Sequence, residues 1–342
     1  MNLNRFFAVF KARNIEFFRD KASLSWNLVF PVLLLIGFAI IFSGDGRSAY
    51  KVGFVNDSQA IEISNINNHD NFKSINFIDY IEYENLETAS KKLVLHSIDL
   101  VIEPAKKQYW INKESSKSYL VEKIFSDQIE GYQRLETSGK KIRYIDWVLP
   151  GILGMNMMFS CLFGVGYVIV RYRKNAVLKR LKATPLSAFE FVSAQLLSRL
   201  FIVMCMSAVV YYGCNLLFDF FMLGSYLDLI VIGILGATSL ISLGLLVASR
   251  SKSQELVGGL LNATSWPMMM LSGVWFSLEG APQALKSFAD FLPLTHLVAG
   301  ARKIITEGAT LGDISYHITY LIVMSIVFLF LGAYFFSWNT ER

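Results

Sequence analysis

The stretch that decides the fold is Trp147–Val170, WVLPGILGMNMMFSCLFGVGYVIV, which contains no Asp, Glu, Lys or Arg. A helix that crosses a hydrocarbon layer of roughly 30 Å needs about 20 predominantly apolar residues. The stretch therefore predicts a membrane-spanning helix, and the same pattern recurs along the chain.

Six charge-free runs of sufficient length occur in the 342 residues. They are Ala22–Gly44, Trp147–Val170, Leu200–Phe218, Leu229–Ser249, Leu256–Leu278 and Ile318–Trp338. The first run is interpreted as a retained helix rather than a signal peptide, because 21 residues precede it and no small-x-small cleavage pattern follows it. We therefore expect an all-α polytopic membrane protein with six transmembrane helices, the first over 22–44 and the other five within 147–342.

The composition is too apolar for a soluble enzyme or a nucleic-acid-binding protein of this size, with 54% hydrophobic and 17% charged residues. The charges are also unevenly distributed, because residues 44–146 hold 14 of the 32 Lys/Arg and 16 of the 27 Asp/Glu. The net charge of +5 therefore has to be interpreted by location, and it does not indicate nucleic acid as a partner.

The charged segment 45–146 is expected to fold as a small inserted α/β domain, since short apolar stretches alternate there with helical patterns. Strands are expected at Lys51–Val55, Ile75–Ile81, Ile98–Ile102 and Gln108–Ile111, and helices at Leu86–Leu95 and Ser116–Thr137. His69 and His96 have no partner Cys or His nearby in the sequence, and zinc needs three or four clustered ligands, so no metal site is expected.

The Lys and Arg residues of the short loops predict how the chain is oriented in the membrane, because short loops rich in Lys and Arg stay on the cytoplasmic side. With the N-terminus in the cytoplasm, the inner segments carry 14 Lys/Arg and the outer ones 3, when residues 44–146 are left out. We therefore expect both termini in the cytoplasm and residues 45–146 outside the bacterial cytoplasmic (inner) membrane. Cys161, Cys205 and Cys214 lie in apolar runs, which predicts no disulfide framework.

Residues 1–21 combine aromatic residues at helical spacing with scattered positive charge. The apolar residues are Leu3, Phe6, Phe7 and Phe10, and the basic ones around them are Arg5, Lys11 and Arg13. This pattern is typical of a helix in the cytoplasmic membrane interface, with rings among acyl chains and cations near anionic lipid head groups. The alternative is a short helical extension of the first span.

The segment 171–190 between the second and third runs is strongly basic. The positive-inside rule explains its charge but not its apolar residues. Val177, Leu178 and Leu181 can form one face of a short helix, which Thr184 and Pro185 would end. A short cytoplasmic helix between two spanning helices is suited to transmit force from a soluble partner.

Four motifs in order carry a family resemblance. They are WVLPGILG at 147–154, LKRLKATPLS at 178–187, LSGVWF at 271–276 and FLPLTH at 291–296. Together with the order of span, outer domain and five further spans, they make the chain resemble the membrane (permease) subunit of ABC-2 type exporters. The resemblance covers essentially the whole chain and includes a large extracytoplasmic domain between the first two spans.

The resemblance implies that 173–186 is the coupling helix, which docks into a cleft of a separate ATPase subunit, and that 1–21 is the interfacial elbow helix. The residues it assigns to ATPase coupling are Arg171, Arg173, Lys174, Leu178, Lys179, Arg180, Leu181, Lys182, Thr184 and Pro185. The chain departs from the family ahead of this element, where Arg173–Val177 replaces the usual acidic residue and Gly-Thr pair.

No G-x-x-x-x-G-K-[ST] motif that would bind nucleotide phosphates occurs in the sequence, and Gly139-Lys140-Lys141 is the nearest fragment. We therefore expect no enzyme activity and no cofactor in this chain, with ATP and Mg bound by an ABC ATPase dimer. Six spans are half of the usual ABC complement, so the expected partners include a second copy of this chain or a homologous permease, as well as membrane lipids.

The region between the fifth and sixth runs is interrupted by helix-breaking and polar residues. The proposed outer gate consists of Pro267, Gly273, Glu279, Pro282, Pro293 and His296. Broken helices at membrane depth are tolerated where protein or a watery cavity satisfies their backbone. This predicts an outer re-entrant hairpin at 277–305, built from half-helices at 277–291 and 293–305, and the alternative is an ordinary outer loop with a surface helix.

The charged residues within the spans bear on the energy source for transport. The six runs contain no Asp or Glu, whereas proton- or sodium-driven carriers keep such residues near the midplane. Arg199, near the inner end of the third run, is expected to extend to the membrane interface. The many Met and Phe residues of the runs would suit an apolar path for cargo, and the alternative is ordinary helix packing.

The expected function is therefore outward transport of a hydrophobic or amphiphilic compound (drug, lipid or similar), driven by a partner ATPase. The first alternative is a membrane-anchored scaffold of an envelope complex that binds partners through 45–146. The second is an intramembrane enzyme that uses Ser272, Asp290 and His296, which is disfavoured because no nucleophile elbow accompanies them.

Overall fold

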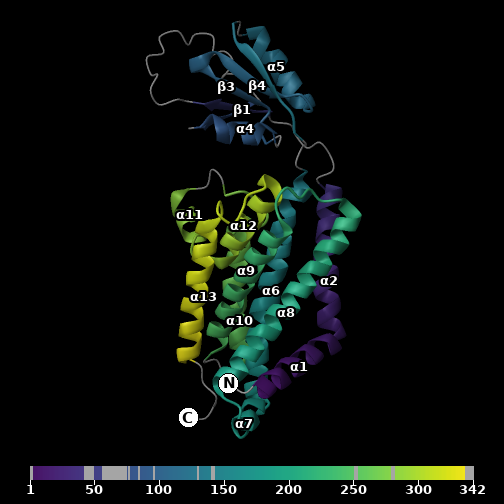
Figure 1. Ribbon diagram of the computed structural model, residues 1–342, viewed down its shortest axis with the longest axis vertical. Coiled ribbons are helices and arrows are strands. Elements are labelled where there is room, and N and C mark those ends of the chain that lie inside the picture. The colour runs from purple at the N-terminus through teal and green to yellow at the C-terminus, as the bar shows by residue number, and fades with distance from the viewer. Residues whose placement is uncertain are drawn as a thin grey trace. The chain divides into compact units, whose positions relative to one another are not determined.

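The computed structural model describes residues 3–41, 50–55, 75, 78–83, 85–94, 97–128, 131–139, 143–249, 253–278 and 282–335. The chain divides into two units (Figure 1). One comprises Met1–Ile41 and Ile145–Arg342 and is called the helical unit; the other comprises Phe42–Tyr144 and is called the sheet unit. His69, His96 and Glu279 lie outside the described residues.

The helical unit is a bundle of long helices with short helices at its ends (Figure 1). Its elements are α1 Leu3–Arg19, α2 Lys21–Ile41, α6 Tyr144–Lys174, α7 Val177–Lys182, α8 Ala188–Phe218, α9 Tyr226–Ala248, α10 Gln254–Leu271, α11 Gln283–Ala289, α12 Pro293–Glu307 and α13 Ser315–Phe335. Helix α9 packs against α8, α12 and α13, and its Leu240 and Leu245 are buried with Leu162 of α6 and Leu261 of α10. These contacts form the core of the unit.

Five of the described helices are long and apolar enough to cross a membrane. They are α2, α6, α8 from Glu190 onward, α9 and α13. This confirms the prediction of a mostly helical chain with several apolar spans. The run Leu256–Leu278 falls mainly on α10, which contains Asn262 and Pro267 and is not among the five, so the count of six spans stays a prediction.

Helix α8 begins well before the predicted start of the third run at Leu200. Its N-terminus is a capping box, in which the Glu190 N–H donates to the Ser187 hydroxyl at 3.1 Å and the Ser187 N–H donates to the Glu190 carboxylate at 3.0 Å. In the sequence, the charge of Arg199 marked the start of the predicted run at Leu200. In the structure, the start of the helix is set by the hydrogen bonds of the cap. Arg199 consequently lies inside the helix.

The sheet unit contains five strands in the order β2-β1-β3-β4-β5. Its elements are β1 Tyr50–Val55, β2 Ile78–Tyr83, α4 Leu86–Val94, β3 Leu100–Glu103, β4 Gln108–Asn112, α5 Ser116–Gln128 and β5 Gln133–Thr137. Strand β1 pairs parallel to β2 and β3, β3 pairs antiparallel to β4, and β4 pairs parallel to β5. A small mixed sheet in a separate unit confirms that part of the predicted fold class.

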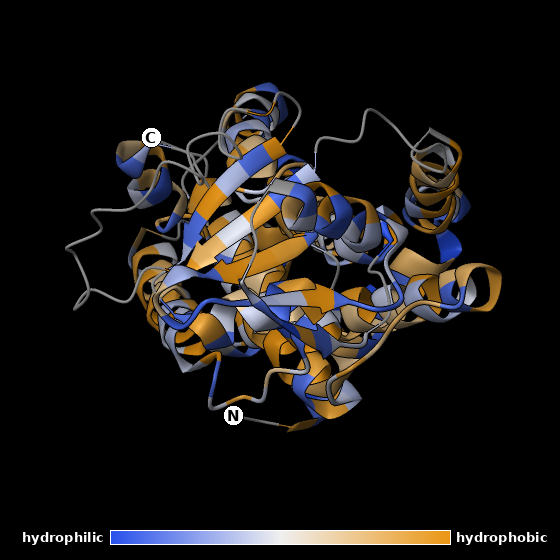
Figure 2. Ribbon diagram, turned by 90° about the horizontal axis from the view of Figure 1, so that it is seen from above, coloured by the Kyte–Doolittle hydropathy of each residue, from blue (hydrophilic) through white to orange (hydrophobic). Residues whose placement is uncertain are grey.

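Each face of this sheet carries its own helix. Phe54 and Ile102 pack with Phe125 of α5, whereas Val101 packs with Leu93 of α4. Successive strand residues point to opposite faces, so neighbouring positions of β3 enter different clusters. Figure 2 shows stretches of hydrophobic colour on the strands of this sheet.

The predicted helix Ser116–Thr137 is wrong in its second half. Helix α5 ends at Gln128, and Gln133–Thr137 forms the edge strand β5 beside β4. Gly131 has a φ of 87°, a conformation that suits glycine and interrupts the helix. Arg134 then pairs with Glu122 of α5 at 2.6 Å, so the polar residues that indicated a solvated helix instead line a strand. Strand β2 is also shifted from the predicted Ile75–Ile81 to Ile78–Tyr83.

Candidate functional site

The segment predicted to contact an ATPase forms a short helix between two long ones. Helix α6 ends at Lys174, the chain turns at Ala176, whose φ is 56°, and α7 then covers only Val177–Lys182 of the predicted 173–186. Leu178 is buried and anchors α7, whereas Arg180 is exposed. The helix thus has one side held in the protein and one side open.

The turn after α7 is also exposed. The Thr184 hydroxyl donates to the Leu181 carbonyl at 2.6 Å, which ends the helix, and Pro185 follows with its side chain exposed. Lys174 is exposed on the other side of α7. The side chains of Lys179 and Lys182 are not among the described ones. Among the predicted coupling residues whose side chains are described, the exposed ones around α7 are therefore Lys174, Arg180, Thr184 and Pro185, and Arg171 is also exposed, in the last turn of α6.

Arg173 is directed into the helical unit and is only 5% exposed. Its Nη1 and Nη2 donate to the carbonyl oxygens of Ala248 at 3.2 Å and Ser249 at 2.9 Å, at the C-terminal end of α9. A cation at this position satisfies carbonyls that lack partners in the helix and interacts favourably with the helix dipole. The structure therefore places this predicted coupling residue in the packing of α6 against α9.

Arg171 belongs to an ionic cluster with α1, here called the Glu16 cluster (Arg13, Glu16, Arg171 and Tyr172). The Glu16 carboxylate accepts from the Tyr172 hydroxyl at 2.5 Å and from Arg13 at 2.5 Å, and it pairs with Arg171. Burial raises the pKa of Glu16, but the Tyr172 hydroxyl and the two guanidinium groups outweigh this effect and hold the pKa below its ordinary value.

The Glu16 cluster connects α1 to the end of α6, and a second contact connects α1 to the other side of α7. Arg5 donates to the carbonyl oxygen of Pro185. Helix α1 therefore touches the chain both before and after the short helix. Sequence reasoning missed Glu16, although it is the only acidic residue in positions 1–19.

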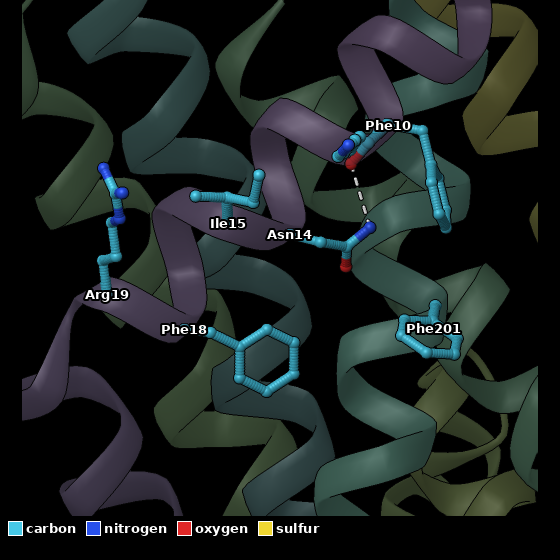
Figure 3. A pocket seen from close by; sticks show the side chains of 7 residues that line it. Phe10, Asn14, Ile15, Phe18, Arg19 and Phe201 are labelled. Atoms are coloured by element: carbon cyan, nitrogen blue, oxygen red, sulfur yellow. Dashed lines mark hydrogen bonds between the residues drawn. The ribbon is translucent and has the colours of Figure 1, made fainter.

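Helices α1 and α8 form the walls of an open groove of about 410 Å³ (Figure 3). Phe10, Ile15 and Phe18 of α1 and Phe201 of α8 line it, together with polar residues of α1. The Asn14 amide donates to the Phe10 carbonyl at 2.9 Å, which keeps that amide on the helix. Aromatic residues flanked by cations are what the predicted interfacial helix requires.

On the opposite end of the helical unit, the glycines of the WVLPGILG motif permit close packing. A Cβ at Gly151 would lie 2.5 Å from the carbonyl oxygen of Val274, and a Cβ at Gly154 would lie 2.8 Å from Val298 of α12. Gly273, with a φ of 68°, turns the chain beside this contact. The motif therefore allows α6, the 272–276 turn and α12 to approach one another.

Arg302 of α12 joins these same segments. Its Nη2 donates to the Gly273 carbonyl at 2.8 Å and its Nε to the Trp147 carbonyl at 3.1 Å. Its guanidinium also lies 3.8 Å from the centre of the Trp147 ring, a cation–π contact. Sequence reasoning counted Arg302 only as an outer positive charge, because nothing in the linear pattern links it to the start of α6.

His296 is completely buried and joins α12 to its neighbours. Its Nε2 lies 2.8 Å from the Asp290 carbonyl oxygen and its Nδ1 lies 3.1 Å from Nδ1 of His317, while its ring stacks on Tyr320. Ser272 is bonded to the Thr295 hydroxyl at 3.0 Å. Within the described contacts, His296 therefore meets the backbone of Asp290, whereas Ser272 meets Thr295, and no nucleophile–base pair is formed between Ser272 and His296.

The predicted half-helices of 277–305 correspond to α11 and α12. Pro267 lies inside α10, Pro282 precedes α11 and Pro293 is the first residue of α12, where the fixed φ of proline suits a helix start. Most of α12 is buried. Re-entry of these helices into the membrane stays a prediction.

Arg199 is buried in the helical unit, and its predicted extension to the membrane interface stays a prediction. Arg199 is 6% exposed and donates to the Ser160 hydroxyl at 2.7 Å as well as to the Ser160 carbonyl. A Cβ at Gly164 would lie 2.0 Å from its guanidinium carbon, so Ser160 and Gly164 form the notch in α6 that holds it. Its guanidinium carbon also lies 5.5 Å from the centre of the Phe17 ring of α1, so Arg199 contacts both α6 and α1.

The described residues contain no group of three or more His, Cys, Asp or Glu that could hold a metal ion. The described contacts at the two ends of the helical unit are packing contacts, the Glu16 cluster and an exposed short helix.

Comparison with known proteins identifies similar chains. The sequence profile of the ABC-2 family transporter proteins matches residues 21–334. The linearmycin resistance permease protein LnrN of Bacillus subtilis (strain 168) is 26% identical over 193 residues, which are 55% of this chain and 46% of that protein. The inner membrane transport permease YhhJ of Escherichia coli (strain K12) is 26% identical over 163 residues, 45% of this chain and 41% of that protein. The putative transport permease YvfS of Bacillus subtilis (strain 168) is 23% identical over 186 residues, 52% of this chain and 72% of that protein. The chain thus matches less than half the length of LnrN and YhhJ.

Proposed function

This chain belongs to the ABC-2 family of transporters, as its four motifs indicated, and from that membership we propose that it is the permease subunit of an ATP-driven export system. In this role it forms the membrane pathway for a hydrophobic or amphiphilic compound. The observation that carries the proposal is the short helix α7, which is anchored by Leu178 between α6 and α8 and exposes Arg180. A surface of this kind suits a soluble ATPase that moves two spanning helices together.

The ATPase is proposed to be a separate ABC subunit, which binds ATP and Mg as a dimer and docks on α7. Lys174, Arg180, Thr184 and Pro185 are the docking residues, because they are exposed around α7. Arg173 is proposed to act indirectly, since its contacts with the end of α9 would transmit a movement of α7 to a second spanning helix. A second copy of this chain or a homologous permease completes the membrane part.

The proposed arrangement in the bacterial inner membrane has both termini in the cytoplasm and the sheet unit outside. Its support is the excess of Lys/Arg in the segments assigned to the cytoplasmic side. Helix α1 then lies in the cytoplasmic interface in contact with lipids, and α11 and α12 form the outer re-entrant hairpin. The gate assigned to Gly273 and His296 lies in the segments that Arg302 and His317 hold.

A hydrophobic or amphiphilic cargo is proposed because the spanning helices are apolar. The described core of the helical unit contains Met155, Met157 and Met158 together with Met268 and Met269, and methionine adapts to ligands of different shape. One relative, LnrN, is named for resistance to linearmycin. Transport of a compound of that general kind is the corresponding proposal for this chain.

The test is co-purification and transport with a candidate ABC ATPase subunit from the same organism. Arg180→Glu combined with Pro185→Ala is expected to abolish both ATPase binding and cargo-stimulated ATP hydrolysis. The matched control is Lys107→Glu, which reverses an exposed charge in the sheet unit. Unchanged ATPase binding and export in the double variant would contradict the proposal.

The alternative is a membrane-anchored scaffold that binds envelope partners through the sheet unit. The observation in its favour is that this unit has its own hydrophobic clusters, on both faces of its sheet. Deletion of 45–143 separates the two functions. A permease would still bind its ATPase, whereas a scaffold would lose all of its interactions.

A further inference from the structure

A cavity of about 460 Å³ lies between α6, α8, α9 and α12 of the helical unit. Its volume is in the range of pockets that hold small molecules, which is about 300 to 1,000 Å³. Three of the four helices that line it are long and apolar enough to span a membrane. The medium around this part of the chain is therefore hydrocarbon, from which an apolar ligand can enter.

Most of the cavity wall is apolar. Helix α6 contributes Leu153 and Met157, α8 contributes Met204, α9 contributes Ile232 and α12 contributes Leu297. The unbranched, polarisable methionine side chains adapt to irregular ligands. This part of the wall fits an alkyl chain or a similar apolar group.

Polar groups gather at one end of the cavity, where α8 ends and α9 begins. Tyr226 is the first residue of α9, and its ring meets that of Tyr211 edge to face with centroids 6.1 Å apart. Asn215 lies in the last turn of α8, and its side-chain oxygen accepts the Phe220 N–H at 3.0 Å. That bond orients the amide and leaves its NH₂ group to donate to a ligand.

The lining residues, all within the described part of the chain, include no Asp, Glu, Lys, Arg or His. An ionised head group in the cavity would lose its hydration without gaining an ion-pair partner, whereas a hydroxyl or carbonyl needs only hydrogen bonds. The wall therefore selects an uncharged polar head.

The cavity opens sideways between α8 and α9. Among its lining residues, Tyr212 is 66% and Ile230 47% exposed, whereas Ile232 at the back is completely buried. A ligand that diffuses within the bilayer therefore reaches the cavity from the side, without passing through water.

From these observations we propose that the cavity binds an uncharged amphiphile. The alkyl part lies against Met157, Met204 and Leu297, and a hydroxyl or carbonyl head lies beside Tyr211 and Asn215. The role of this site in transport rests on the proposed function, since the bound amphiphile is then the cargo. Binding itself requires neither ATP nor the ATPase.

The test uses the full chain in phosphatidylcholine nanodiscs and a monoacylglycerol that carries a photoactivatable diazirine in its alkyl chain. Specific labelling is the part that an excess of unlabelled monoacylglycerol removes, and mass spectrometry locates it. We expect specific labelling at or beside Met157, Met204 and Leu297, against which the alkyl part lies. The corresponding diazirine fatty acid, whose head is ionised, should give no specific labelling there.

Two variants that fill the cavity from different helices test the location. Ala208→Phe acts from α8, and Gly233→Leu acts from α9, where a Cβ would meet only the flexible end of Met204 at 3.3 Å. Each is expected to reduce specific labelling about tenfold, which corresponds to about 1.4 kcal/mol. The matched control is Val209→Phe, because Val209 is 56% exposed and does not line the cavity.

The proposal is overturned if labelling near Met157, Met204 and Leu297 does not saturate. It is also overturned if both filling variants keep the wild-type unfolding temperature and are labelled like the control. The proposed function fails separately. Saturable labelling without ATP-dependent export would leave the binding site in place and contradict the permease role.

Discussion

Arg302 and Arg173 both donate to backbone carbonyl oxygens at positions where helices begin or end. Arg302 holds the carbonyls of Trp147 and Gly273, and Arg173 holds those of Ala248 and Ser249. The carbonyls of Ala248, Ser249 and Gly273 stand at or just after the C-terminal ends of α9 and α10, where carbonyls lack partners within the helix, so a guanidinium there satisfies groups that burial would otherwise leave unpaired. The positive charge of these residues thus stabilises helix packing.

Replacing Arg302 should therefore destabilise the helical unit. Arg302→Leu removes two hydrogen bonds from a charged group and the contact with Trp147, for an expected loss of about 2 to 4 kcal/mol. The measurement is unfolding of the purified protein in detergent with increasing SDS. Lys303→Gln, one position along, should change stability by less than about 0.5 kcal/mol; equal effects of both substitutions would show that Arg302 is an ordinary surface residue.

Glu16 should make stability depend on pH. Its pKa is lowered from the ordinary value of 4.5, so its stabilising contribution is fully present above that pH and is lost as the pH falls through the lowered value. We expect Glu16→Gln to have a lower unfolding temperature than the wild type at pH 7, and this difference to shrink below about pH 4.5. Glu87→Gln is the control, because Glu87 pairs with Lys91 at the exposed surface, where such pairs contribute little. A difference between wild type and Glu16→Gln that stays constant with pH would refute the prediction.

At the scale of elements, the sequence predicted spans well and their ends poorly. Runs without charge correctly located five apolar helices, because burying unpaired charge in hydrocarbon is costly enough to shape the whole run. The start of α8 was misplaced because two of its charged residues are hydrogen-bonded: Glu190 forms the N-terminal cap with Ser187, and Arg199 bonds to the buried Ser160, 39 residues away in the sequence. Only the folded contacts show that these charges are compatible with a buried helix.

The same limit applies to the candidate site. The exposed residues of α7 follow from composition and the position of Pro185, whereas the inward direction of Arg173 and the Glu16 cluster depend on contacts over 75 and 155 residues of sequence. Strand β5 was missed for a similar reason, because its polar residues are fixed by pairing with β4 and not by their own periodicity.

The contact between α6 and α8 provides a prediction at this scale. Gly164→Ala would force a methyl group into the place of the Arg199 guanidinium, and overpacking of this kind costs about 1 to 3 kcal/mol. Arg199→Met in the same chain should relieve much of that cost, because the flexible thioether can move aside. Thermal unfolding of the two single variants and the double variant measures the coupling. If the losses of stability in the two single variants simply add in the double variant, Gly164 and Arg199 are not coupled and the prediction is wrong.

For the whole molecule, the two units have separate cores. The main cluster of the helical unit draws only on residues of that unit, and the clusters around Phe125 and Leu93 draw only on the sheet unit. We therefore expect residues 45–143 to fold when expressed alone. The measurement is a cooperative thermal transition with a mixed helix and strand circular dichroism spectrum; a spectrum of a disordered chain would contradict it.

The separation of the clusters has a consequence for how such a gene can change over time. A substitution in the sheet unit's core needs a compensating change only among its own residues, and the same holds for the helical unit. The two parts can accordingly accumulate mutations at different rates, and the inserted segment between α2 and α6 can be replaced or remodelled for a new environment while the transport machinery keeps its ancestral packing.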